Sequence, residues 1–141
     1  MSATITVDSS ALAALAFDEG DAAQILDAIL AADTRRMGAF TMLETTLVVT
    51  SRKGAAGQAI LDSLIEVLDL EVVPLDADQV REAGHAWRRF GKGHHPAALN
   101  IGDCCSYAVA RLTDSPLLCK GNDFPQTDLE LVEYQPARRR L

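Results

Sequence analysis

Short apolar runs alternate along the chain with longer stretches in which apolar residues recur at helical spacing. A short apolar run bounded by turn residues is typical of a buried strand, and the longer spacing is typical of a helix with one apolar face. The runs predict strands over residues 3–7, 36–40, 71–74, 117–119 and 129–134. The longer stretches predict helices over residues 11–17, 21–32 and 41–52, and further helices that begin near residues 54, 76 and 100. Because parallel strands are joined by crossover helices, this alternation predicts an α/β domain with a largely parallel sheet.

Three of the predicted helices have a continuous apolar face. The faces consist of Leu61, Leu64, Ile65 and Leu68; of Val80, Ala83, Gly84 and Trp87; and of Ile101, Cys105, Ala108, Val109 and Leu112. Residues at this spacing lie on one side of a helix, and so we expect them to face inward. On this ground Trp87 is predicted to lie in the core or in an interface, rather than to stack on a nucleic-acid base.

Several helix starts carry capping residues. The predicted caps are Ser9 or Ser10, Asp76 with Gln79, Thr41 with Glu44, and Asn100 with Asp103. In such pairs the acidic residue has a structural explanation, because its carboxylate satisfies a free backbone amide or interacts favourably with the helix dipole. Capping alone therefore accounts for Glu44 and for Asp103.

Four acidic residues nevertheless stand where apolar runs stop and a helix or loop begins. They are Asp8, Glu44, Asp103 and Asp123. Ligands of open α/β sheets bind beyond the carboxyl ends of the strands, and so we expect these segments to converge there. Asp8 has no capping role that Ser9 or Ser10 could not perform, although Asp123 and Asp128 have the alternative of being turn residues. Carboxylates brought together repel one another, and a hard divalent cation such as Mg²⁺ usually neutralises them.

The net charge is −7, from 13 Lys and Arg against 20 Asp and Glu. This balance argues against a protein that holds nucleic acid by bulk charge. The basic residues are clustered, however, which leaves room for a local nucleic-acid surface. The candidates for nucleic-acid or phosphate contact are Arg88, Arg89, Lys92, His94, His95 and Lys120. The adjacent histidines lack the helical spacing of a metal-binding pair, and we expect them in a surface loop.

The length of 141 residues suits one domain, which we place at residues 1–135, followed by a short basic tail at residues 136–141. The three cysteines form neither an even disulfide framework nor a zinc-binding spacing, and we expect reduced, buried thiols. The N-terminal region lacks the basic and apolar segments of a signal peptide, and no stretch predicts a membrane-spanning helix. We therefore expect a cytoplasmic protein.

Four motifs carry a resemblance to a known family. They are Val-Asp8-Ser-Ser-Ala-Leu, Leu-Glu44-Thr-Thr, Leu-Asn-Ile-Gly-Asp103-Cys-Cys-Ser-Tyr-Ala and Pro-Leu-Leu-Cys-Lys-Gly-Asn-Asp123-Phe. In this order they resemble the PIN-domain ribonucleases, and most closely the VapC-type toxins of bacterial toxin–antitoxin pairs. The resemblance covers essentially the entire chain.

The resemblance implies a three-layer α/β/α sandwich and hydrolysis of RNA that depends on Mg²⁺ or Mn²⁺. All four acidic positions of the family are filled. By this comparison Asp8 and Asp103 are the principal metal ligands and Glu44 completes the acidic centre. Asp123 would hold a second ion or a water molecule. The accessory residues are Ser9, Ser10 and Asp128.

The resemblance also implies partners. The first is a VapB-type antitoxin whose C-terminal segment lies across the acidic groove and directs an Arg or Lys into the carboxylates. RNA is the expected substrate, with the clustered basic residues at its rim. A homodimer is expected, with apolar residues of the first helices as candidates for its interface. We expect operator DNA to be contacted only through the antitoxin, and no contact with membranes.

Two other function classes stay open at this stage. A phosphoacceptor receiver domain also places aspartates at strand ends and Mg²⁺ in an acidic pocket. It carries paired acids after its first strand, however, which this chain lacks. A catalytically silent binding module would share the fold, but loss of an acidic position would have indicated it. The motifs do not identify which RNA is cut.

Overall fold

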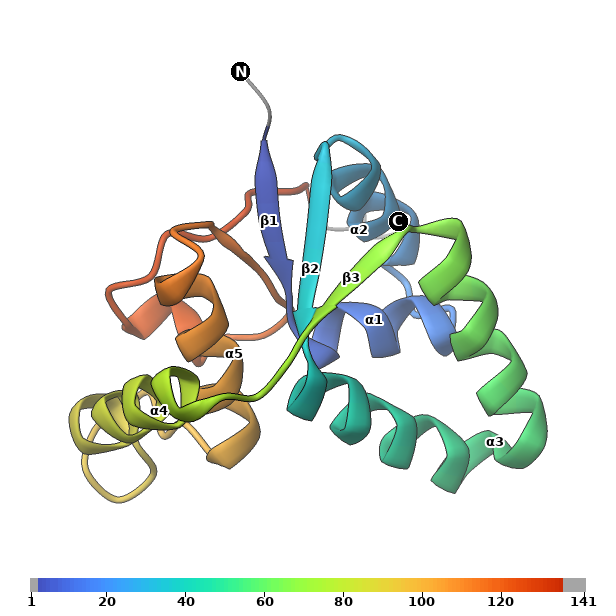
Figure 1. Ribbon diagram of the computed structural model, residues 1–141. Coiled ribbons are helices and arrows are strands. Elements are labelled where there is room, and N and C mark those ends of the chain that lie inside the picture. Colours follow the sequence, from blue (N-terminus) through green and yellow to red (C-terminus); the bar gives the residue numbers. More distant parts are fainter. Residues whose placement is uncertain (1–2, 136–141) are drawn as a thin grey trace, which may run out of the picture.

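A computed structural model describes residues 3–135 of the protein (Figure 1). Its strands are β1 Thr4–Val7, β2 Thr34–Gly38, β3 Leu70–Val73 and β4 Leu117–Leu118. Its helices are α1 Ser9–Ala16, α2 Ala22–Leu30, α3 Ala39–Val67, α4 Ala77–Phe90 and α5 Ile101–Leu112, with a 3-10 turn, η1, at Phe124–Gln126. The basic tail predicted over residues 136–141 lies outside the described residues.

The strands form one parallel sheet in the order β3-β2-β1-β4. Helices α1, α2 and α3 pack together on one face of this sheet, and α4 and α5 pack on the other (Figure 1). This is the three-layer α/β/α arrangement that was predicted. Because α1 follows β1 and α3 follows β2, both helices begin at the carboxyl edge of the sheet, which is the lower edge in Figure 1. Ligand sites of open α/β sheets lie at this edge.

Each face of the sheet has its own core. One core contains the fully buried Leu12, Ile25 and Leu61, and the other contains Leu99, Tyr107 and Leu117. All three cysteines are free and buried, as predicted, and burial raises the pKa of each thiol. In the part of the chain that the structure describes, no helix is long and apolar enough to cross a membrane.

The strand predicted over residues 129–134 is wrong. This segment makes only an isolated bridge, between Leu131 and Leu117. Strand β4 is two residues long and offers no longer edge for pairing. At this bridge the Leu117 N–H donates to the Glu130 carbonyl at 3.0 Å and the Val132 N–H donates to the Leu117 carbonyl at 2.9 Å. The Tyr134 hydroxyl also donates to the carbonyl of Cys119 at 3.2 Å. The other four predicted strands are present with shifted bounds.

The two helices predicted to meet near residue 54 do meet there: α3 consists of two helical stretches joined at a kink at Gly54, whose backbone is not helical. The φ angle of Gly54 is 59°, a value that glycine adopts without steric cost. Helix α3 begins at Ala39, and so Thr41 does not cap it. The Thr41 hydroxyl pairs instead with the hydroxyl of Ser106 at 3.2 Å.

Two of the predicted apolar faces are partly exposed. Val80 and Trp87 on α4 are 59% and 40% exposed, and Ile101 and Leu112 on α5 are 68% and 49% exposed. The prediction of a core position is therefore wrong for Val80, Ile101 and Leu112. Helix α4 packs mainly on α5 rather than on the sheet, and so part of its apolar face points away from both cores.

Candidate functional site

The four acidic residues named from the sequence converge at the carboxyl edge of the sheet, and we refer to them as the acidic cluster. Asp8 follows β1, Glu44 lies early in α3, Asp103 lies in the first turn of α5, and Asp123 precedes η1. The charges of the other three all raise the pKa of Asp103. Four segments that are distant in the sequence thus place their carboxylates near one another.

Asp8 is the most buried member of the acidic cluster, with 2% of its surface exposed. Its Oδ2 accepts hydrogen bonds from the backbone N–H of Ser10 at 3.1 Å and from the Ser10 hydroxyl at 2.7 Å. Its Oδ1 accepts from the Ser106 hydroxyl at 2.6 Å. Asp8 therefore caps α1, and the expectation that Ser9 or Ser10 does so is wrong. The extended backbone of Asp8 (φ −82°, ψ 159°) puts its own carboxylate at the capping position.

Glu44 does not cap α3, because the helix begins at Ala39, more than a turn earlier. The capping box predicted for Glu44 is therefore wrong. Its carboxyl group lies against Gly102 in the first turn of α5, where a Cβ on residue 102 would overlap it. Burial raises the pKa of Glu44, the Ser9 side chain lowers it and the charge of Asp8 raises it, and the net result is a raised pKa.

Asp103 forms the capping box that was predicted. Its Oδ2 accepts from the Asn100 backbone N–H at 3.0 Å, and its own N–H donates to Asn100 Oδ1 at 2.8 Å. Burial is the main cause that raises its pKa, the bond from Asn100 lowers it, and the remaining members of the acidic cluster raise it, to about 6 from the usual 3.8. The capping role and membership of the acidic cluster thus coexist in one residue.

Asp123 is the exposed member of the acidic cluster. It precedes η1, but its carboxylate makes no capping bond. Its backbone carbonyl, rather than its side chain, accepts from the Gln126 N–H at 3.2 Å. Asp123 therefore takes part in the turn through its backbone and not through its carboxylate. The charge of that carboxylate raises the pKa of Asp103.

A divalent cation is the group that the chemistry of the acidic cluster implies, because carboxylate oxygens are the ligands that Mg²⁺ prefers. Among residues 3–135, none of the ion pairs includes a member of the cluster. In the same part of the chain, no three His, Cys, Asp or Glu side chains stand close enough to enclose an ion. The carboxylates repel one another, and those of Asp8 and Asp103 are held in place by bonds to serine and backbone groups. They suit a cation in type and charge.

Two serine hydroxyls connect the acidic cluster to the scaffold. The Ser10 hydroxyl donates to Asp8 and accepts from the Lys120 backbone N–H at 2.9 Å, and so it joins the start of α1 to the chain after β4. Ser106 also donates to Asp8 and was missed by the sequence interpretation. Its signal was its position three residues after Asp103, which puts both side chains on one face of α5.

Asp128, the third accessory candidate, contacts a different group of residues. Its Oδ1 accepts from the Tyr107 hydroxyl at 2.6 Å, and its Oδ2 pairs with Arg89 at 3.1 Å. Burial raises the pKa of Asp128, but Tyr107 and Arg89 lower it, and the net pKa lies below its usual value. Asp128 therefore attaches the segment after η1 to α4 and α5.

Of the six basic candidates, two form ion pairs with carboxylates of the protein. Arg89 pairs with Asp128, and Lys120 pairs with Glu19 at 3.1 Å and with Asp21 at 3.0 Å. Besides Arg89, the exposed candidates on α4 and in the loop that follows it are Arg88, Lys92 and His94. This loop leads directly into the first turn of α5, which contains Asp103.

Both histidines lie in that loop, as predicted, and their rings pack against aromatic side chains of α4. The His94 ring lies edge-on to Trp87 with centroids 5.5 Å apart, and the His95 ring lies edge-on to Phe90 at 5.1 Å. Nδ1 of His95 also accepts from the Ala97 N–H at 3.0 Å. These contacts attach the loop to the end of α4 and fix its conformation.

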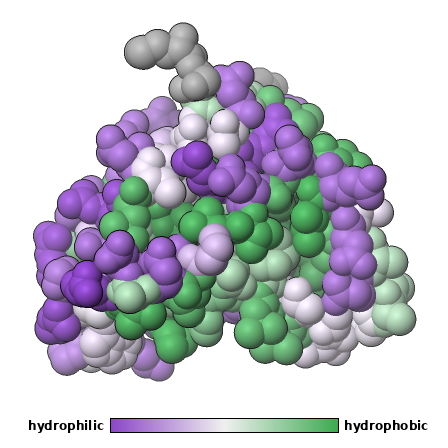
Figure 2. Space-filling view, viewed as in Figure 1, coloured by the Kyte–Doolittle hydropathy of each residue, from purple (hydrophilic) through white to green (hydrophobic). Residues whose placement is uncertain are grey.

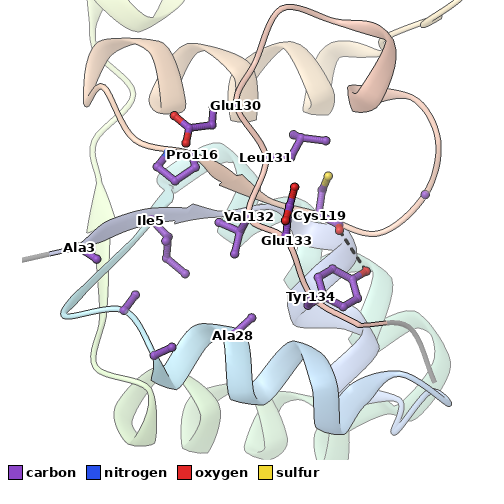
Figure 3. Close-up of a pocket in the computed structure, with 13 residues that line it drawn as sticks. Ala3, Ile5, Ala28, Pro116, Cys119, Glu130, Leu131, Val132, Glu133 and Tyr134 are labelled. Carbon is purple, nitrogen blue, oxygen red and sulfur yellow. Dashed lines mark hydrogen bonds between the residues drawn. The ribbon is translucent and has the colours of Figure 1, made fainter. Parts of the chain in front are cut away.

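A broad hollow lies elsewhere, between β1, α2 and the segment that follows β4 (Figure 3). Its walls include Ile5, Ala28 and Val132, with Glu130 and Glu133 among the few charged side chains. No member of the acidic cluster is among its lining residues. The hollow thus lacks the convergent polar groups that catalysis requires, and the acidic cluster is the stronger candidate site.

A hydrophobic surface covers part of α3 and α4 in the lower half of Figure 2. We call its central depression the apolar groove, which is lined by Phe40, Leu75, Val80, Ala83, Gly84, Trp87, Ile101, Cys104 and Cys105. Phe40 lies one turn before Glu44, and Ile101 lies in the same turn as Asp103, so the groove adjoins the acidic cluster. Of the large hydrophobic residues of α1 and α2, only Leu30 is exposed.

Comparison with known proteins gives consistent similarities. Residues 5–130 match the PIN domain family. Ribonuclease VapC from Mycolicibacterium smegmatis is 42% identical over 128 residues, which cover 91% of this chain and 99% of the relative. Ribonuclease VapC28 from Mycobacterium tuberculosis is 45% identical over 125 residues, which cover 88% of this chain and 94% of the relative.

Two solved structures share the fold. VapC20 from Mycobacterium tuberculosis, described as a sarcin-ricin loop cleaving toxin, has a TM-score of 0.76 at 16% identity, and the match covers 93% of this chain and 99% of that one. VapBC2 from Rickettsia felis, bound to a DNA fragment from its promoter, has a TM-score of 0.74 at 13% identity, covering 94% and 99%. These similarities extend across nearly the whole chain.

The raised pKa of Asp103 predicts a pH-dependent effect on stability. Because the folded-state pKa of about 6 exceeds the usual 3.8, the proton on Asp103 stabilises the metal-free protein below pH 4, and this contribution is lost as the pH rises through 6. Asp103→Asn keeps an acceptor for Asn100 and removes the charge. We expect it to raise the melting temperature at pH 7.5 and to have a smaller effect at pH 4.5.

Differential scanning calorimetry in EDTA measures this effect. Asp78→Asn is the matched control, because Asp78 lies in the first turn of α4 and pairs there with Arg81 at 3.1 Å. The control should not raise the melting temperature at pH 7.5. Equal shifts for Asp103→Asn at both pH values would mean that the charge of Asp103 is not unfavourable in the folded protein.

Proposed function

The chain belongs to the PIN-domain VapC ribonucleases, and we propose that it is a toxin that hydrolyses RNA at a divalent cation held by the acidic cluster. The cation is Mg²⁺, with Mn²⁺ as its substitute. The observation that carries the proposal is the convergence of four carboxylates whose charges act on one another. A metal-free enzyme would gain nothing from this arrangement, because like charges brought together destabilise the fold.

Asp8 and Asp103 are the proposed principal ligands. Asp8 is buried and fixed by three hydrogen bonds, so that its carboxylate is oriented before any cation arrives. Asp103 is fixed by its capping box at the start of α5. Glu44 completes the set, and the exposed Asp123 holds a second ion or a water molecule. When bound, the cation would activate a water for attack on the phosphodiester and offset charge on the phosphate oxygens.

The protein groups have distinct tasks in this reaction. Ser10 and Ser106 hold both oxygens of Asp8, which prevents the ligand from rotating. Asp103 must lose its proton before it can act as a ligand, and because its pKa is raised to about 6 in the metal-free protein, binding of the cation must compete with that proton at lower pH. No side chain is required as a nucleophile.

RNA is proposed to enter beside the loop between α4 and α5. Arg88 and Lys92 are exposed there, and the loop ends at the first turn of α5 next to Asp103. Their charges offset the repulsion between the phosphate backbone and a chain of net charge −7. Arg89 and Lys120 are weaker candidates, because both already form ion pairs.

The proposed protein partners are a VapB-type antitoxin and a second copy of this chain. The acidic cluster is a receptor for an Arg or Lys side chain of the antitoxin, since among residues 3–135 no cationic group pairs with it. One matched structure is itself a VapBC2 complex bound to promoter DNA. For the present chain we propose contact with operator DNA only through the antitoxin.

Metal removal and substitution of Asp8 test the proposed reaction. Purified protein freed of antitoxin should cut a mixed cellular RNA preparation at defined sites in Mg²⁺ or Mn²⁺ and should not cut it in EDTA. Asp8→Asn and Asp103→Asn should each slow cutting by about a hundredfold or more, because each removes a ligand charge. Sequencing of the fragment ends measures the cutting and identifies the RNA.

Asp78→Asn is again the matched control and should cut like the unmodified protein. Undiminished cutting in EDTA would rule out a cation-dependent reaction. Absence of cutting by well-folded protein with either metal would favour a catalytically silent binding module of the same fold.

The two exposed cations Arg88, at the end of α4, and Lys92, in the loop that follows, generate a separate prediction. Arg88→Gln together with Lys92→Gln should weaken binding of the RNA identified above and reduce the slope of log K against log salt by about 1 to 2, because up to two phosphate contacts are lost. Fluorescence anisotropy in an Asp103→Asn background, which prevents cutting, measures both quantities. Arg81→Gln with Arg111→Gln removes the same charge away from the end of α4 and the loop, and should leave the slope unchanged. If the Arg88/Lys92 variant, the Arg81/Arg111 control and the Asp103→Asn parent all give the same slope, RNA does not contact Arg88 or Lys92.

A further inference from the structure

The position of Glu44 depends on the absence of a side chain at residue 102. The Glu44 carboxyl group occupies the volume that a Cβ on Gly102 would fill in the first turn of α5. The three atoms nearest to that Cβ position all belong to the Glu44 carboxyl group. Gly102 is itself buried, and so Glu44 closes directly over the start of α5.

Gly102 has no conformational reason to be glycine. It lies within α5 and is not among the glycines with positive φ. Glycine at a helical position weakens the helix relative to alanine, because it loses more backbone entropy on folding. The contact with Glu44 explains why residue 102 is glycine, which the helix itself does not explain.

Gly84 on α4 provides the contrast. A Cβ on Gly84 would meet nothing closer than Nη1 of Arg88, at 3.6 Å, which is an ordinary contact distance. Both glycines are helical, but only Gly102 has a carboxylate of the acidic cluster in the space beside it.

We propose that Gly102 is a positioning residue for the metal centre: its missing side chain lets the Glu44 carboxylate lie next to Asp103 at the start of α5. This inference rests on the proposed function, because it treats Glu44 as a metal ligand. A methyl group at residue 102 would displace the carboxyl end of Glu44, which is the flexible end of a long side chain. The helix itself would remain, and so the expected damage is to cation binding and not to folding.

A double-mutant cycle on Mn²⁺ affinity tests the proposal. Gly102→Ala should weaken Mn²⁺ binding, measured by isothermal titration calorimetry, by about tenfold to a hundredfold. The double variant Gly102→Ala with Glu44→Ala should bind no more weakly than Glu44→Ala alone, because the glycine acts through Glu44. In RNA cleavage, Gly102→Ala should raise the Mn²⁺ concentration needed for half-maximal rate and leave the KM for RNA unchanged. Its melting temperature without metal should not fall.

Gly84→Ala is the matched control and should bind Mn²⁺ like the unmodified protein. Unchanged affinity in Gly102→Ala, or a double variant whose loss equals the sum of the single losses, would overturn the proposal. If the unmodified protein binds no Mn²⁺, the proposed function fails and this proposal fails with it. If Mn²⁺ binds, metal-free crystal structures of the unmodified and Gly102→Ala proteins test separately whether residue 102 sets the position of Glu44. Displacement of Glu44 in Gly102→Ala would support the positioning role, and an unmoved Glu44 would overturn it.

Discussion

The burial of like charges at one edge of the sheet is the constraint on which the rest of this site depends. Asp8 is almost completely buried, and two serine hydroxyls and a backbone N–H donate hydrogen bonds to its carboxylate in place of the water it loses. These three bonds tie β1, α1 and α5 together at the point where the other carboxylates arrive. The groups that compensate for the burial of the Asp8 carboxylate are therefore the same groups that orient it.

The start of α5 concentrates several of the required features. Asp103 caps the helix and contributes a carboxylate, Gly102 leaves space for Glu44, and Ser106 donates to Asp8 one turn later. The raised pKa values of Glu44 and Asp103 indicate that their negative charges are unfavourable in the metal-free protein. Any cation that enters, whether an ion or a basic side chain of a partner, offsets these buried negative charges and stabilises the folded state.

The sequence predicted the layered fold and the convergence of the acidic residues, because both depend on local signals. Asp8 directly follows an apolar strand, and Asp103 is paired with a capping residue. Glu44 was placed near the site but given the wrong structural role, since its helix starts before the threonine that appeared to cap it. Gly102 and Ser106 were missed because their partners lie 58 and 98 positions away in the sequence. Helical spacing places Ser106 on the same face of α5 as Asp103 but does not identify Asp8 as its partner. The apolar groove escaped prediction for a similar reason: helical spacing identifies an apolar face but does not say whether another element covers it.

Diffraction at the manganese absorption edge from crystals grown with Mn²⁺ tests the central claim most directly. If the acidic cluster is a metal centre, an anomalous peak will lie within bonding distance of the Asp8 and Asp103 carboxylates, with Glu44 turned toward it. The peak will be absent from crystals of Asp8→Asn grown in the same way. A map without a peak at the cluster, or with Mn²⁺ bound only elsewhere on the protein, would contradict this account.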